Sequence, residues 1–196
     1  MSDVIAALTC DHVNIAKILD LLESEILAIE VGKTPDYPLL QDIMCYMNQY
    51  PDRFHHPKED LVFEKLVERD PTASAAVNDA LDQHISIGLA GREFDRMLRT
   101  SEVDSVHVRE GIGTAGFAYI RALRQHILLE DKTLFPMAKA ALTDRDWQSV
   151  NREIDAIEDP LFGKMIADGY KRLYRLITDH ARSDAVATGA DNRDLP

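Results

Sequence analysis

The segment H-H-P-K-E-D-L-V-F, residues 55–63, decides the fold because a second segment of the same kind, H-I-L-L-E-D-K-T-L-F, follows at residues 126–135. In each segment a histidine precedes a glutamate by four positions, as His55–Glu59 and His126–Glu130. Residues four apart on an α-helix lie one turn along and only about 40° around it. Each segment therefore predicts a helix with an imidazole and a carboxylate on the same face.

Two further histidines extend this repeat. His84 follows His12 by 72 residues, and the second histidine–glutamate pair follows the first by 71 residues. A single histidine on an apolar helix face is more often a hydrogen-bonded core residue, and a single histidine–glutamate pair more often lies at the surface. Four histidines and two glutamates at matched offsets instead predict a metal site inside a helix bundle.

The spacing of apolar residues predicts the helices. Along the first helix these residues alternate three and four apart, which is typical of a bundle seam. The seam positions are Ile5, Leu8, His12, Ile15, Leu19, Leu22, Ile26 and Ile29, and Gly32 ends the helix. Three more helices are expected at about residues 38–69, 72–99 and 105–142. Pro57 cannot donate a backbone hydrogen bond, which predicts a kink or break there.

Short connections make neighbouring helices antiparallel, so we expect an all-α fold with an up-down four-helix bundle at residues 1–142. A shorter helix begins at the capping residue Thr143, and another follows Asp159-Pro160 and ends near His180. We expect residues 143–182 to form a helical extension packed on the bundle. The small, polar and acidic residues 183–196 predict a disordered tail.

Composition excludes several classes of protein. The formal net charge of −12 disfavours nucleic acid and anionic membrane surfaces as partners. No apolar run approaches the ~20 residues of a membrane span, and the N-terminus lacks the basic region of a signal peptide. We therefore predict a cytoplasmic protein in which Cys10 and Cys45 are reduced thiols.

Gly111–Gly116 reads GIGTAG, which matches the dinucleotide-binding pattern G-x-G-x-x-G. That pattern requires a preceding strand in a βαβ unit, and nothing else in the sequence predicts a parallel sheet. We expect these small residues to allow close approach between helices instead.

The sequence resembles the hemerythrin-like HHE cation-binding family. The matching segments are DHVNI, FHHPKEDLVF, DQHI and RQHILLEDKTLFP, which span about residues 5–140, and DRDW and DPLFG resemble more weakly the C-terminal extension of some bacterial members. The resemblance implies a four-helix bundle with an oxo- or hydroxo- and carboxylate-bridged centre of two iron ions. Histidine and carboxylate ligands also suit manganese or zinc, which are less favoured. The expected metal ligands are His12, His55, Glu59, His84, His126 and Glu130.

The sequence departs from the oxygen-carrying hemerythrins, which have His-x-x-x-His on the third helix. Here Ala80 and Gly88 stand four residues before and after His84, so reversible oxygen carriage is disfavoured. The carriers also have an aspartate five residues after the last histidine, and Asp131 holds that position. Asp131 lies about 140° around the helix from His126, whereas Glu130 lies about 40°. Glu130 is thus the predicted ligand, and Asp131, like Asp60 beside Glu59, is an alternative ligand or a hydrogen-bonding partner.

Two further residues have two interpretations each. His56 points about 100° away from His55 on a regular helix, so it is either a surface imidazole or a seventh ligand that the Pro57 kink turns inward. Tyr119 precedes His126 by seven residues and shares its face. It is either a core aromatic residue or a hydrogen-bond donor to a bound small molecule, and Tyr50 is a weaker candidate of the same kind.

Three functional classes follow. The favoured one is a di-iron protein that binds or reacts with dioxygen, nitric oxide or peroxide in the response to oxygen, nitrosative or oxidative stress; whether it is an enzyme is left open. The alternative is an iron- or oxygen-responsive sensor or adaptor whose metal state controls a protein partner. The third is a structural or storage metal site. A homodimer is compatible with each class.

Overall fold

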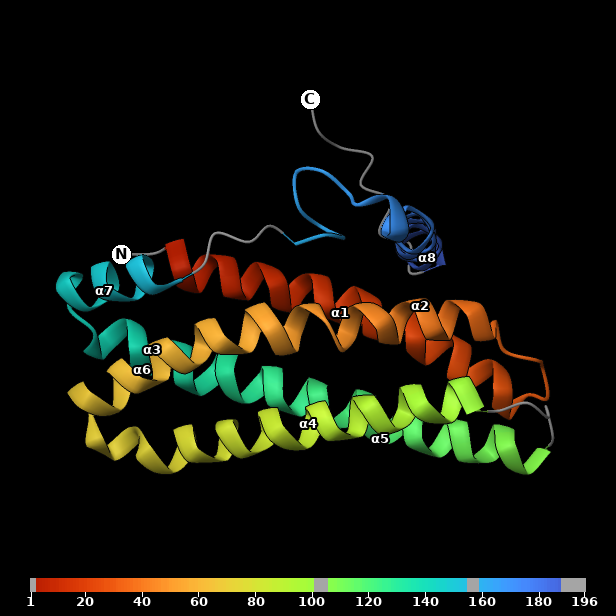
Figure 1. Ribbon diagram of the computed structural model, residues 1–196, viewed down its shortest axis with the longest axis horizontal. Coiled ribbons are helices and arrows are strands. Elements are labelled where there is room, and N and C mark those ends of the chain that lie inside the picture. Colours follow the sequence, from red (N-terminus) through yellow and green to blue (C-terminus); the bar gives the residue numbers. More distant parts are fainter. Residues whose placement is uncertain (1–2, 101–105, 155–158, 188–196) are drawn as a thin grey trace.

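The structure is a computed structural model, which describes residues 3–100, 106–154 and 159–187. Every regular element in these ranges is helical, which confirms the predicted all-α class (Figure 1). The α-helices are α1 (Asp3–Glu30), α2 (Tyr37–Met47), α3 (His56–Arg69), α4 (Ser74–Thr100), α5 (Val106–Leu129), α6 (Phe135–Ala141), α7 (Asp144–Glu153) and α8 (Lys171–Ala187). Within these ranges no helix is both long and apolar enough to cross a bilayer.

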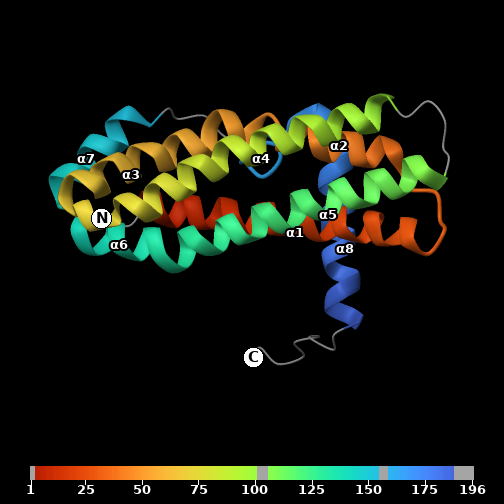
Figure 2. The same cartoon turned by 90° about the horizontal axis from the view of Figure 1, so that it is seen from below.

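The long helices form rods that lie side by side along the long axis: α1, α2 with α3, α4, and α5 with α6 (Figure 1). Successive rods run in alternating directions, as the colours in Figure 1 show. The rods contact one another through α1 and α5, α4 and α5, and α2 and α4. Helix α7 packs on α3 at one end, and α8 crosses α1 and α2 and projects beyond the rods (Figure 2).

The buried core has two apolar halves with a polar layer between them. All eight seam positions predicted on the first helix are buried, as expected. Leu8 belongs to the apolar half beside α7, and Ile15 belongs to the longer half under α8. His12 lies between them in sequence and is 2% exposed. The bundle therefore encloses the polar layer between apolar side chains.

Two π-helical segments interrupt the rods, at Pro51–His55 and Glu130–Leu134. The single helix expected at residues 38–69 is divided, and the break precedes Pro57 instead of centring on it. Each π-helical segment ends two residues before a proline, Pro57 or Pro136. A proline ring clashes with the carbonyl four residues earlier, and a widened turn at that point relieves the clash.

The extension begins as the sequence predicts. Thr143 and Asp146 form a reciprocal capping box at the start of α7. The guanidinium of Arg69 donates two hydrogen bonds to the Asp146 carboxylate, at 2.9 and 2.8 Å, and so ties α7 to α3. These contacts attach the beginning of the extension to the bundle.

Helix α8 packs through the buried side chains of Leu173 and Ile177. It continues to Ala187, so the prediction that it ends near His180 and gives way to a tail at residue 183 was wrong for residues 183–187. The Ser183 hydroxyl donates to the carbonyl of Asp179, and the alanines that follow favour helix. Residues 188–196 of the predicted tail lie outside the described ranges.

The GIGTAG segment lies within α5, and Gly116 allows the close approach that its small residues predict. A Cβ atom added at Gly116 would lie 2.7 Å from Ile26 Cδ1 and 3.1 Å from Phe94 Cζ. A Cβ atom added at Gly113 would have no neighbour within 4 Å. The two glycines of the same helix thus differ in what surrounds them.

Replacing these glycines with alanine should have opposite effects. Gly116→Ala crowds Ile26 and Phe94 and should lower the free energy of unfolding by about 1–3 kcal/mol, the usual range for an overpacked core. Gly113→Ala should raise it by up to about 1 kcal/mol, because alanine favours helix more than glycine does. Urea unfolding of both variants measures this difference. Equal stability of the two variants would contradict the close packing at Gly116.

Candidate metal centre

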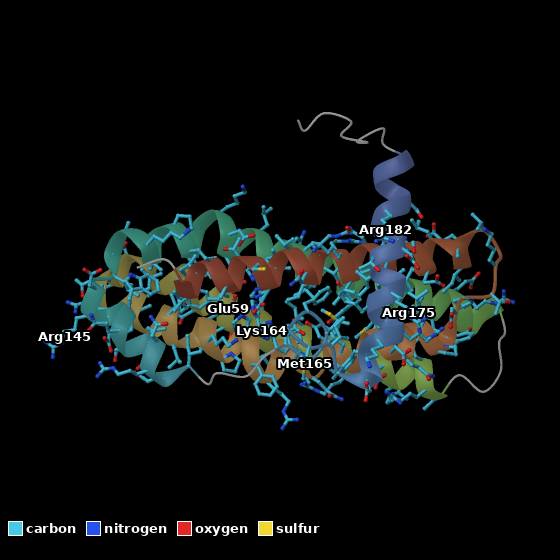
Figure 3. The ribbon with its side chains drawn as sticks, turned by 90° about the horizontal axis from the view of Figure 1, so that it is seen from above. Glu59, Arg145, Lys164, Met165, Arg175 and Arg182 are labelled. Atoms are coloured by element: carbon cyan, nitrogen blue, oxygen red, sulfur yellow. The ribbon has the colours of Figure 1, made fainter. Side chains whose placement is uncertain are left out.

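The polar layer brings together the six ligands that the sequence predicts. His12 comes from α1, His84 from α4 and His126 from α5; His55 ends the first π-helical segment, Glu59 lies on α3, and Glu130 begins the second π-helical segment. The His84 side chain is 9% exposed and the other five are 2% exposed or less. Figure 3 shows Glu59 among the long helices, between the α7 end and the α8 crossing.

The two oxygens of Glu59 face different histidines. Glu59 Oε1 lies 3.2 Å from His12 Nε2 and 3.1 Å from His55 Nε2. Glu59 Oε2 lies 3.4 Å from His84 Nε2. A carboxylate placed in this way can bridge two cations, each of which it shares with a different set of imidazoles.

Glu130 completes the arrangement from the opposite rod. Its Oε2 atom lies 3.3 Å from His12 Nε2 and 3.2 Å from His126 Nε2. Its Oε1 atom lies 3.4 Å from His84 Nε2. Two carboxylates thus lie between the histidines of all four rods.

His56 also lies inside the bundle, with 6% of its surface exposed. Its ring stacks on His84, with centroids 4.2 Å apart, and lies edge-on to His126 at 5.7 Å. One potential ligand group contains His56, Glu59, His84 and His126, and a second contains His12, His55 and Glu59. In each group the ligand atoms lie within 4.8 Å of one another. The π-helical segment before His56 explains why a regular helix, with 100° per residue, does not predict its direction.

Each of the four histidines that are predicted ligands makes a hydrogen bond through Nδ1, the ring nitrogen that does not face the glutamates. The Nδ1 pairs are His12 with Asp131 (2.9 Å), His84 with Asp60 (3.1 Å), His55 with Asp11 (3.1 Å) and His126 with Gln83 (3.2 Å). An Nδ1–H group that donates to an oxygen fixes the ring and leaves Nε2 free to bind a cation. All four Nε2 atoms lie beside the glutamate carboxylates.

The sequence analysis gave Asp60 and Asp131 as alternative ligands or hydrogen-bonding partners, and in the structure both are hydrogen-bonded to a histidine. Asp11 and Gln83 were missed, although each directly precedes a seam histidine and the two are 72 residues apart, as those histidines are. The internal repeat therefore includes the Nδ1 partners as well as the predicted ligands. The two halves of the repeat differ at two of these positions. The second half has Gln83 where the first has Asp11, and Ile127 where the first has His56.

The hydrogen bonding of three buried atoms in the polar layer indicates whether this site suits a cation. Within the described residues, Glu59 Oε2, Glu130 Oε2 and His126 Nε2 make no hydrogen bond. The Gln83 contact makes His126 Nδ1 the donor, so His126 Nε2 is an acceptor facing the acceptor Glu130 Oε2, 3.2 Å away. Buried acceptors without donors are destabilising, and a cation between them satisfies both. The donor set therefore fits a metal ion.

Comparison with known protein families matches residues 3–138 to the hemerythrin HHE cation binding domain. The chain belongs to this family. A comparison with curated proteins finds no match. The matched residues include all six predicted ligands, His56 and the four Nδ1 partners, and they end before α7.

Without a metal, the hemerythrin-like site holds protons. Burial lowers the pKa of His12, but the nearby carboxylates of Asp131, Glu130 and Glu59 outweigh burial and raise it to about 11. In the same way the pKa of His84 is raised to about 11, and that of His55 to about 9. Burial and the neighbouring His84 charge instead lower the pKa of His126 to about 2. At neutral pH three imidazoles are thus charged and one is neutral.

Metal binding should therefore release protons. Ferrous iron added anaerobically at pH 7 must displace the protons on His12, His55 and His84, so its apparent affinity rises with pH.

The stability of the metal-free fold should instead fall as pH rises. Its imidazolium–carboxylate stabilisation is fully present below the ordinary histidine pKa of 6.5 and is lost as pH rises through 9 to 11. An indicator dye measures the proton release, and thermal unfolding measures the slope. A metal-free protein that gains stability between pH 7 and 10 would contradict this ionisation pattern.

Tyr119 lies in the longer apolar half of the core. It is 3% exposed, and its ring centroid lies 6.4 Å from that of Phe94. This position favours the core interpretation of Tyr119. The tyrosine connected to the ligand layer is Tyr50, whose hydroxyl lies 3.4 Å from Asp11 Oδ2.

Proposed function

We propose that this protein is a non-heme di-iron protein that binds or reacts with dioxygen, nitric oxide or peroxide in a stress response. The observation that carries the proposal is the position of the Glu59 carboxylate, whose two oxygens face two different histidine groups. Membership of a cation-binding family supports it. In this proposal residues 1–142 form the up-down four-helix bundle of the family, and residues 143–182 are an extension packed on it.

The two ligand groups differ in size, which suggests where a small molecule binds. His56, His84 and His126 would hold one iron ion, and His12 and His55 would hold the other. Glu59 and Glu130 would serve both ions. The group with two imidazoles offers fewer protein ligands and therefore leaves more room for dioxygen, nitric oxide or peroxide. Nitrogen and oxygen ligands without thiolate suit iron, and also suit manganese or zinc.

The surrounding residues would control the chemistry. Bound iron supplies a reversible one-electron redox couple and a position for a small ligand. Asp11, Asp60, Asp131 and Gln83 hold the imidazoles in the orientation that presents Nε2 to the interior. The Phe135 ring stacks on His12, with centroids 5.4 Å apart, and the apolar side chains on either side of the layer limit access of water.

The first test is metal content with an optical spectrum, on protein purified without a histidine tag. About two irons per chain are expected, as in other carboxylate-bridged bundles. Charge-transfer bands that bleach on reduction and return in air would then identify a redox-active pair, and dioxygen, peroxide and nitric oxide can be compared in turn. Zinc alone, or no metal and no reconstitution with iron, would contradict the proposal.

A sensor or adaptor is the second candidate, and the attachment of the extension favours it. Asp159, which follows α7, accepts a hydrogen bond from the Tyr46 hydroxyl at 2.8 Å, and Asp146 of α7 binds Arg69 of α3. Metal-dependent changes in the rods could thus reach residues 143–187. Limited proteolysis of iron-loaded and metal-free protein separates the candidates. A sensor predicts a different cleavage pattern in the extension, and a protein that only binds small molecules predicts the same pattern in both states.

A further inference from the structure

A series of contacts leads from the ligand His55 into the aromatic core. His55 Nδ1 lies 3.1 Å from Asp11 Oδ2, and the Tyr50 hydroxyl lies 3.4 Å from the same oxygen. The Tyr50 ring stacks on that of Tyr46, with centroids 5.7 Å apart and planes at 17°. Tyr46 is therefore connected to the two-histidine ligand group through one aromatic ring and one carboxylate.

Tyr46 has a buried proton acceptor of its own. Its side chain is fully buried, and its hydroxyl donates to Asp159 Oδ2 at 2.8 Å. The backbone N–H groups of Leu161 and Phe162 donate to Asp159 Oδ1 at 2.7 and 3.0 Å. Asp159 lies beyond the residues that match the family, so the extension supplies this carboxylate.

The ionisation of this pair suits proton transfer between its members. Burial raises the pKa of Tyr46 well above its ordinary value, and the Asp159 carboxylate raises it further. Burial also raises the pKa of Asp159, although its three hydrogen bonds oppose this effect. The phenol therefore keeps its proton, and the carboxylate accepts a proton more readily than an exposed aspartate does.

The contacts continue from Tyr46 towards the surface. The Tyr170 ring lies edge-on to Tyr46, with centroids 5.8 Å apart, and Tyr170 is partly exposed. The Tyr170 hydroxyl donates to Gln49 Oε1 at 3.4 Å. An electron donor in solution can thus reach an aromatic ring that contacts Tyr46 without entering the bundle.

We propose that Tyr46, paired with Asp159, is a proton-coupled one-electron donor to the oxidised metal centre. This inference rests on the proposed function. When excess hydrogen peroxide has oxidised the irons that these ligands would hold, the Tyr46 O–H bond would break. Its electron would pass through Tyr50, Asp11 and His55 to the centre, and its proton would move to Asp159 Oδ2. The excess peroxide would be the terminal oxidant, because each molecule takes up two electrons and two protons to form two waters. The product is a neutral tyrosyl radical. A one-electron reductant such as ascorbate, acting through Tyr170, returns the electron, and the proton returns from Asp159.

Electron paramagnetic resonance tests this step. Iron-loaded, reduced protein is mixed with hydrogen peroxide and frozen, and a tyrosyl radical signal that narrows with ring-deuterated tyrosine is expected. Tyr46→Phe keeps the ring but removes the O–H bond, so the signal should be lost. Asp159→Asn keeps an oxygen for the two backbone N–H groups but removes the proton acceptor, so loss is expected here too. Tyr119→Phe, which removes a different buried hydroxyl, should keep the signal.

Iron content and the optical spectrum of the same samples separate this inference from the proposed function. Wild-type protein that binds no iron overturns the proposed function, and the electron-donor role with it. Protein with a reversible iron spectrum but no radical, or with a radical that survives both Tyr46→Phe and Asp159→Asn, overturns the electron-donor role alone. If Tyr46→Phe does not fold or load iron, Asp159→Asn decides the question by itself.

Discussion

Glu59→Gln should reduce the iron content of the protein from about two ions per chain to less than one. The Glu59 carboxylate is fully buried, and its two oxygens face His12 and His55 on one side and His84 on the other. Glutamine keeps the size of the side chain but replaces one oxygen with an NH₂ group, which cannot bind a cation. It also removes one of the negative charges that offset the charge of the ions. Elemental analysis of the purified variant after reconstitution measures the effect.

Glu64→Gln is the matched control. Glu64 lies on the same helix, α3, but is exposed. Its replacement makes the same chemical change and should leave the iron content at the wild-type value. A Glu59→Gln protein that binds as much iron as Glu64→Gln would show that Glu59 is not a ligand.

Removing the metal should lower the melting temperature by on the order of 10 °C. Ligand at a thousand times its dissociation constant stabilises the folded state by about 4 kcal/mol. For a chain of this size, each kcal/mol corresponds to about 2–4 °C. The physical cause is the buried layer, in which Glu59 Oε2, Glu130 Oε2 and His126 Nε2 make no hydrogen bond in the absence of a cation. Calorimetry of ferrous-loaded and chelator-treated protein under argon measures the shift.

Two controls show whether the shift comes from this site. Magnesium, which prefers oxygen ligands, should not restore the melting temperature of the stripped protein. Glu59→Gln should melt at nearly the same temperature with and without ferrous iron. Equal melting temperatures for loaded and stripped wild-type protein would mean that the polar layer is stable without a metal and that the ligands are not coupled to folding.

Local patterns were enough to predict most of the helices and most residues of the polar layer. The seam from Ile5 to Ile29 follows from helical periodicity, and every one of its positions is buried. The helix cap at Thr143 follows from local chemistry and is present. The six predicted ligands follow from two matched offsets, because an internal repeat places equivalent residues at equivalent heights on rods that run in the same direction. These features depend on interactions within one helix or on the symmetry of the repeat, and both can be recognised from the sequence alone.

The helix breaks and the direction of His56 were less predictable. Pro57 signals an interruption, but it does not show that the preceding turn widens at Pro51–His55. A helical wheel assumes the same rotation at every residue, so it fails across a π-helical segment. Helix α8 likewise passes the expected boundary at His180, because alanines support helix even where the sequence also has the composition of a tail.

The sequence by itself determined that the protein is all-α, that His12, His55, Glu59, His84, His126 and Glu130 meet, and which family it belongs to. Only the tertiary structure decided which oxygen of Glu59 faces which histidine, that Asp11 and Gln83 hold two of the imidazoles, and that Tyr46 meets Asp159. The physical reason is the range of the interactions. Periodicity and spacing describe which residues share a face, whereas a hydrogen bond between side chains 113 residues apart, as in Tyr46 and Asp159, depends on how the rods and the extension pack.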